Sequence, residues 1–189
     1  MAIRIKSRWH DSQRNEAADK SLHDAAGALA FIAWRLALDK AKNLHGQDFV
    51  YRTDGQRVAV ICEYLAFCVQ IADRLVHRMG YDDGDRRVFI EAFARRVAEH
   101  VEDNAIDLFG PGDYRSGFIA TLNERAGEYA DYGYDDDGPA YSFLHLLGQK
   151  ILGIMGSDQT NKWAIDQVME IDAPAVDERL RKALTDLLS

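Results

Sequence analysis

The stretch from Gln56 to Met79 is apolar on almost every side when it is wound into a helix, and it constrains the fold more than any other segment. Its apolar residues, which leave only a narrow polar stripe, are Val58, Ile61, Cys62, Leu65, Phe67, Cys68, Val69, Ile71, Ala72, Leu75 and Val76. Such a helix must be covered by neighbouring elements over most of its surface. The sequence therefore predicts a helix that lies inside a larger bundle.

Most of the remaining chain also shows helical periodicity, with start and stop signals between the segments. The further helices are expected near residues 15–44, 86–108, 113–129, 139–155, 158–171 and 172–187. We therefore predict an all-α fold, with residues 1–189 forming one domain of six or seven helices. The helix that begins at Pro139 is expected at its centre, because its residues from Phe143 to Ile154 are apolar nearly all round.

Two short segments alternate apolar and polar residues in the manner of strands rather than helices. They are Ala2 to Lys6 and the segment near residues 48–52, which contains Phe49, Val50 and Tyr51. We expect them to pair as a minor two-stranded ribbon, although such a ribbon is only marginally stable alone. Residues 1–13 otherwise have no helical pattern and are predicted to form a flexible or extended arm.

The charge balance argues against one large class of partners. The chain carries 31 acidic and 23 basic residues, for a formal net charge of −8. Nucleic-acid binding needs clustered Lys and Arg to contact phosphates, so we expect no nucleic-acid partner. The 47% of hydrophobic residues is typical of an ordinary globular protein.

The cysteines and the longest apolar run indicate the compartment. Cys62 and Cys68 would lie about 9 Å apart along one helix and on different faces, too far for a disulfide between them. Reduced thiols of this kind favour a cytoplasmic location. No signal peptide is expected in residues 1–20, and the apolar run from Ala25 to Trp34 ends at Arg35, which is too short for a membrane span.

One residue pair suggests an enzyme. His23 and Asp24 are adjacent at the start of the first predicted helix, and the pair resembles the ligands of the HD metal-dependent phosphohydrolases. That resemblance implies divalent metals that activate water against a phosphoester, with His10 as the earlier ligand and Asp73 or Asp103 as the later one. We favour the simpler interpretation, in which an exposed His precedes an Asp favoured by the helix dipole, and predict that neither residue binds metal.

Other catalytic and cofactor motifs are absent from the sequence. No His is preceded by Glu at the three-residue spacing that a ferritin-like di-iron bundle requires. There is also no Gly-x-Ser-x-Gly, no phosphate-binding Gly-x4-Gly-Lys and no Cys-x-x-Cys. We therefore expect no cofactor.

The polar stripe of the helix over residues 56–79 is a candidate binding site. Glu63, Gln70, Arg74 and His77 fall within about 60° on the helical wheel, with Asp73 beside them. Such a stripe either faces solvent or lines a polar pocket. We predict that it faces solvent, because burying an unpaired Glu63 would cost several kcal/mol.

The first predicted helix is a candidate interface. From Ala25 to Leu38 it carries one charged residue, Arg35, so its apolar surface exceeds the arc that a surface helix needs. We expect a homodimer in which Phe31, Trp34 and Leu38 meet a second copy about a two-fold axis. The leading hypothesis is thus a non-enzymatic protein that acts by helix-mediated self-association or by binding a protein partner. The metal-dependent phosphohydrolase is the alternative.

Overall fold

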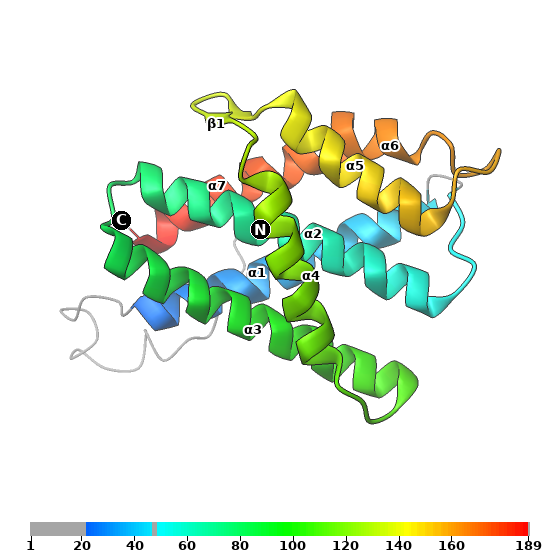
Figure 1. The fold of residues 1–189 in the computed structure, drawn as a ribbon, viewed down its shortest axis with the longest axis horizontal. Helices are drawn as coiled ribbons and strands as arrows, with labels where there is room; N and C mark the ends of the chain where they lie inside the picture. The colour runs from blue at the N-terminus through cyan, green and yellow to red at the C-terminus, as the bar shows by residue number, and fades with distance from the viewer. Residues whose placement is uncertain (1–21, 47–48, 189) are drawn as a thin grey trace.

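The structure, a computed structural model, describes residues 22–46 and 49–188, and these residues are mainly helical (Figure 1). The elements in chain order are α1 (Leu22–Gly46), α2 (Asp54–Arg78), α3 (Asp83–Phe109), α4 (Tyr114–Tyr129), β1 (Tyr134–Asp135), β2 (Gly138–Pro139), α5 (Tyr141–Met155), α6 (Ala164–Gln167), the π-helical turn η2 (Val168–Asp172) and α7 (Ala173–Leu188). The predicted all-α class is confirmed.

Helix α2 is buried on most sides, as its apolar pattern predicts, and it lies at the centre of the fold. Every residue from Val60 to Ala72 is buried except Cys62, which is half-buried. The helix contacts α1, α3, α4, α5 and α7. The expectation that α5 is central is wrong: α5 leaves Gln149 and Gly153 exposed and packs through one face only, formed by Phe143, Leu146, Leu147, Gly148, Ile151 and Met155.

The two-stranded ribbon forms in a different place from the predicted one. Tyr134 pairs with Pro139 and Asp135 with Gly138 in an antiparallel register, and Gly138 supplies the positive φ of 113° that this tight connection needs. Residues 49–51 are not in a strand. The partner predicted for them, residues 2–6, lies outside the described residues, as does the arm predicted over residues 1–13.

The chain turns from α6 into α7 without the break predicted at Asp172. The π-helical turn η2 joins them, and Asp172 lies buried at its end. The Tyr64 hydroxyl donates a hydrogen bond to the Asp172 carboxylate at 3.0 Å, and the Lys40 ammonium lies 3.4 Å from it. Asp172 therefore ties the end of η2 to α1 and α2.

The last turn of α3 and the first turn of α4 extend beyond the other helices at the lower right of Figure 1. Only the inner side of this hairpin is covered, so Ile106, Leu108 and Phe109 are all exposed near the end of α3. Within residues 22–46 and 49–188, none of the helices combines the length and the apolar character needed to cross a membrane.

Candidate functional site

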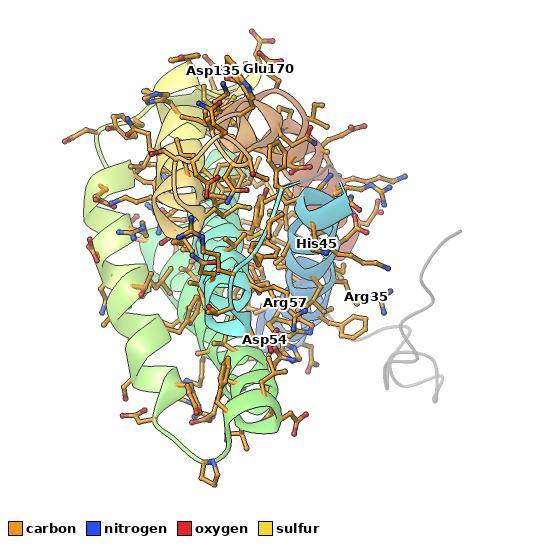
Figure 2. All side chains as sticks on the ribbon, turned by 90° about the vertical axis from the view of Figure 1, so that its right-hand side faces the viewer. Arg35, His45, Asp54, Arg57, Asp135 and Glu170 are labelled. Atoms are coloured by element: carbon orange, nitrogen blue, oxygen red, sulfur yellow. The ribbon has the colours of Figure 1, made fainter. Side chains whose placement is uncertain are left out.

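A cavity of about 630 Å³ opens where the second half of α1, the segment 49–53, the start of α2 and the end of α3 meet. This volume lies in the range of protein sites for small molecules. Figure 2 shows the molecule from the end at which the cavity opens. The lining residues are Leu38, Ala41, Lys42, His45, Tyr51, Arg52, Thr53, Asp54, Arg57, Ile61, Asn104 and Leu108.

The inner wall of the cavity is apolar and aromatic. Ala41 and Ile61 belong to the buried core, so the cavity reaches down to the packed interior. The Tyr51 ring stacks on His45, with 6.3 Å between centroids and an angle of 15° between the planes. Its hydroxyl donates a hydrogen bond of 2.9 Å to the Ala41 carbonyl oxygen, which fixes the ring against α1. A ligand would therefore meet a preformed apolar surface.

The rim carries basic side chains, although the net charge of the whole chain is negative. Lys42 and His45 come from the end of α1, whereas Arg52 and Arg57 come from the segment around the start of α2. The Arg57 guanidinium lies 2.9 Å from the Asp54 carboxylate, and both side chains are exposed. The N-terminus of α2 adds about half a positive charge at the same place. The rim is therefore suited to an anionic group.

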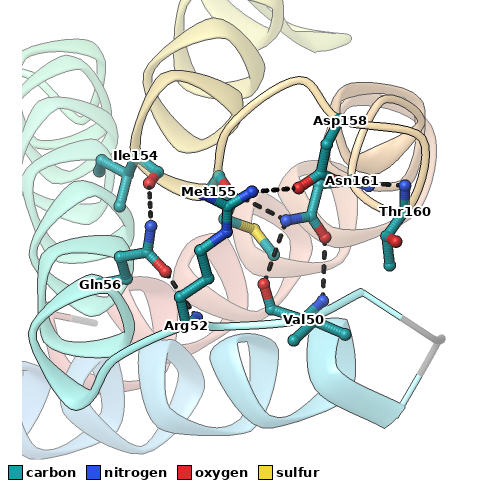
Figure 3. A network of polar contacts seen from close by, with 8 residues as sticks. All are labelled: Val50, Arg52, Gln56, Ile154, Met155, Asp158, Thr160 and Asn161. Carbon is teal, nitrogen blue, oxygen red and sulfur yellow. Dashed lines mark hydrogen bonds and ion pairs between the residues drawn. The ribbon is translucent and has the colours of Figure 1, made fainter.

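Figure 3 shows how the cavity wall is held from the far end of the chain. Asn161, which is only 1% exposed, accepts a hydrogen bond of 2.9 Å from the Val50 N–H and donates one of 3.1 Å to the Val50 carbonyl oxygen. Its amide also donates to the Met155 carbonyl oxygen at 3.0 Å. The Asn161 side chain thus pairs with the backbone of Val50 as a neighbouring strand would.

Two further contacts fix the segment that enters α2. The Gln56 amide donates to the Ile154 carbonyl oxygen at 2.9 Å and accepts from the Arg52 N–H at 2.7 Å. The Arg52 guanidinium pairs with the Asp158 carboxylate at 2.6 Å and lowers the pKa of that carboxyl group. Together with Asn161, these contacts position Tyr51 and the start of α2.

Contrary to prediction, the polar stripe of α2 does not face solvent at Glu63. Glu63 is 4% exposed, and its two carboxylate oxygens accept hydrogen bonds of 2.8 Å from Nε and Nη2 of Arg125, which is 8% exposed. Arg125 also contacts Glu124 and Glu128, and Glu128 contacts Lys150. A buried, bidentate partner on α4 removes the cost that argued for solvent exposure.

The rest of the stripe points in several directions. Gln70 is buried, His77 is exposed, and Asp73 pairs with Arg86 through contacts of 2.7 and 2.6 Å. Arg74 is half-buried and donates to the Tyr129 carbonyl oxygen at 3.1 Å. Glu63 and Arg74 bind α4 at different points, Asp73 binds Arg86 of α3, and His77 faces solvent, so the stripe does not form one binding site.

His23 and Asp24 are both exposed at the start of α1. Among the residues that the structure describes, no three His, Cys, Asp or Glu side chains are grouped in a way that could hold a metal ion. His10, which the phosphohydrolase resemblance would require, lies outside them. Asp73 is engaged with Arg86, and Asp103 is exposed on α3.

The three residues of the predicted interface have different surroundings. Phe31 is 39% exposed on the outer side of α1. Trp34 is half-buried and stacks on His100, with 5.8 Å between ring centroids, while Leu38 is half-buried and lines the cavity. Of the three, only Phe31 is exposed.

The two cysteines are free in the structure. Burial, together with the negative charge of the neighbouring Glu63, raises the pKa of the Cys62 thiol to about 12. Burial also raises the pKa of the Cys68 thiol. Both thiols are therefore protonated at neutral pH, which makes them poor nucleophiles.

Sequence reasoning missed Arg125 and Asn161. Arg125 could have been found, because it shares the three- and four-residue spacing of the buried α4 residues Phe118, Leu122 and Tyr129. An arginine in such a face needs a buried acid, and Glu63 is the acid that lies among the apolar residues in the middle of α2. Asn161 gave no comparable signal, because it lies between helices in a polar stretch.

The comparisons with known proteins assign no function to this site. No family model matches the chain, and neither the curated proteins nor the solved structures gave a match.

Proposed function

We propose that the protein acts by binding rather than by catalysis, and that the cavity between α1, α2 and α3 receives a small ligand. One observation carries the proposal: a cavity of about 630 Å³ combines an apolar inner wall with a basic rim, in a chain whose net charge is −8. A few polar groups around an apolar surface are typical of small-molecule sites. The free, protonated thiols support a cytoplasmic location.

The lining groups are better placed to hold a ligand than to attack one. The Thr53 hydroxyl already accepts a hydrogen bond from the Gln56 N–H as the cap of α2. Arg52 and Arg57 have ion-pair partners, and the ring of His45 stacks on Tyr51. These side chains are oriented before any ligand arrives, which lowers the entropy cost of binding.

A ligand screen with a cavity-filling variant tests the proposal. Thermal shift assays on the full chain should find compounds that raise the melting temperature, and native mass spectrometry should show them bound. Leu108→Trp should abolish the shift, because Leu108 lines the cavity. Phe109→Trp is the matched control, since Phe109 is the next residue, is exposed and does not line it. Equal responses of both variants would place the ligand elsewhere.

Self-association through α1 is a second candidate function. The observation that favours it is Phe31, whose ring is 39% exposed. The neighbouring Gly27 leaves open space, since a Cβ atom there would meet nothing within 4 Å. A second copy of α1 could approach closely at this point and cover the ring.

Light scattering and circular dichroism on Phe31→Asp test this candidate. We expect a dimeric wild type and a folded, monomeric variant, because a charge in the contact is costly to bury. Tyr141→Asp is the control, because Tyr141 is exposed on α5. A wild type that is monomeric at micromolar concentration would rule the candidate out.

A further inference from the structure

We propose that the ligand of this cavity is a small amphiphile with one carboxylate and an apolar chain. This inference rests on the proposed binding function and specifies its ligand class. The ligand class follows from the lining of the cavity, which has both basic groups and an apolar wall. A bare ion would leave the apolar wall uncovered, and a neutral molecule would leave the basic groups without a counter-charge.

The head group is assigned to Arg57 and Lys42. The structure describes no ion pair for Lys42, whereas Arg57 already holds a carboxylate, that of Asp54, at 2.9 Å. The Arg57 and Asp54 side chains are 45% and 60% exposed, and an exposed pair of this kind contributes little to stability. A ligand carboxylate can therefore replace Asp54 on the guanidinium at small cost and gain the attraction of Lys42.

The geometry of a guanidinium favours this head group. Its paired N–H donors match the two oxygens of a carboxylate. The N-terminus of α2 lies at the same rim and adds attraction for a negative charge. Arg35 offers a contrast on α1, because it is equally basic but points away from α2 in Figure 2 and does not line the cavity.

The apolar chain is assigned to the part of the cavity one helical turn from the head group, because Leu38 lies four residues before Lys42 on α1 and Ile61 four residues after Arg57 on α2. Leu38 and Ile61 provide the inner surface, and Leu108 continues it to the exposed end of α3. A bare anion such as phosphate would leave this surface facing water, whereas a neutral chain would leave the basic rim without its counter-charge. Burial of the ligand's apolar chain strengthens binding by roughly 25 cal/mol for each Å² of apolar surface removed from water.

Isothermal titration calorimetry on the full chain with three matched probes tests the assignment. Octanoate has both parts, 1-octanol has the chain without the charge, and acetate has the charge without the chain. We expect octanoate to bind at least about tenfold more tightly than 1-octanol, and acetate to show no measurable binding. Measured at pH 7, octanoate should also displace any compound found by the thermal shift screen.

Three variants locate the head group. Arg57→Gln should weaken the binding of octanoate about tenfold and leave the affinity for 1-octanol within about twofold of the wild type. The charge-matched control Arg35→Gln should change neither affinity. Asp54→Asn should strengthen octanoate, because it removes the competing carboxylate. Circular dichroism confirms folding, which these exposed substitutions should preserve.

The failures are distinguishable. Equal affinities for octanoate and 1-octanol, or an Arg57→Gln variant that binds octanoate normally, would overturn the assignment of the carboxylate and leave the cavity as a binding site. Absence of octanoate binding, together with a screen compound that Leu108→Trp excludes, would overturn the ligand class alone. Absence of any ligand that Leu108→Trp excludes would overturn the binding function and this inference together.

Discussion

Replacing Glu63 with Gln removes one charge from the buried ion pair with Arg125 and leaves the shape of the side chain almost unchanged. In the wild type both carboxylate oxygens of Glu63 accept hydrogen bonds of 2.8 Å. The amide of Gln offers only one acceptor and turns its NH₂ group toward the guanidinium. One charge-assisted hydrogen bond is therefore lost, and two donors face each other.

The size of the effect follows from the burial of the pair. Removing one partner of a buried ion pair costs about 3 to 5 kcal/mol, because the other charge is left without compensation. Here Arg125 keeps contacts of 3.0 Å to Glu124 and 2.9 Å to Glu128, so the loss should fall at the lower limit, near 3 kcal/mol. For a chain of this size such a loss lowers the melting temperature by roughly 6 to 12 °C.

Urea denaturation followed by circular dichroism measures the change in unfolding free energy. Glu124→Gln is the matched control: it makes the same chemical change next to the same arginine, but its side chain is 63% exposed. It should cost less than about 1 kcal/mol. Replacing the whole pair, as Glu63→Leu with Arg125→Met, should recover most of the loss. A Glu63→Gln variant within about 0.5 kcal/mol of the wild type would refute the reasoning.

Two further predictions concern buried polar groups. The Tyr129 hydroxyl is buried and finds no hydrogen-bond partner among the described residues, so Tyr129→Phe should stabilise the protein by about 1 kcal/mol in urea denaturation, and a loss of stability would reveal a missed partner. Burial raises the pKa of the Asp172 carboxyl group although Lys40 opposes the shift, so the folded state favours the protonated acid. The protonated Asp172 therefore contributes its whole stabilising effect below the pKa of the unfolded state, about 4. That contribution is lost as the pH rises through the higher pKa of the folded state. The difference in unfolding free energy between wild type and Asp172→Asn should therefore favour the wild type more at pH 4 than at pH 7, and a difference that is independent of pH would contradict this.

The class of the fold was predictable because helical periodicity is a local property. The apolar run over residues 56–79 and the predicted end of the first helix near residue 44 each depend on neighbouring residues alone, and both agree closely with α2 and with the end of α1 at Gly46. The central position was not predictable in the same way. The sequences of α2 and α5 are both strongly apolar, and only the path of the chain decides which one is surrounded.

The candidate site was even less predictable from local sequence. Arg57, His45 and Leu108 are ordinary residues in three separate helices, and no spacing in the sequence relates them. Glu63 was assigned to solvent because its partner lies 62 residues away. A search for charged residues within each apolar face would have paired it with Arg125, whereas the cavity itself required the fold.

The hydrogen bonds between Val50 and Asn161 have a consequence for synthesis of the chain. These residues are 111 positions apart, so the hydrogen bonds that hold Val50 cannot form until Asn161 has been made. At about 5 to 20 residues per second, that delay lasts roughly 5 to 20 s after Val50 is made. Throughout that time α1 and the start of α2 exist without the contacts that close the cavity. If the cavity binds octanoate as proposed, a nascent chain truncated before residue 161 should bind it more weakly than the full chain.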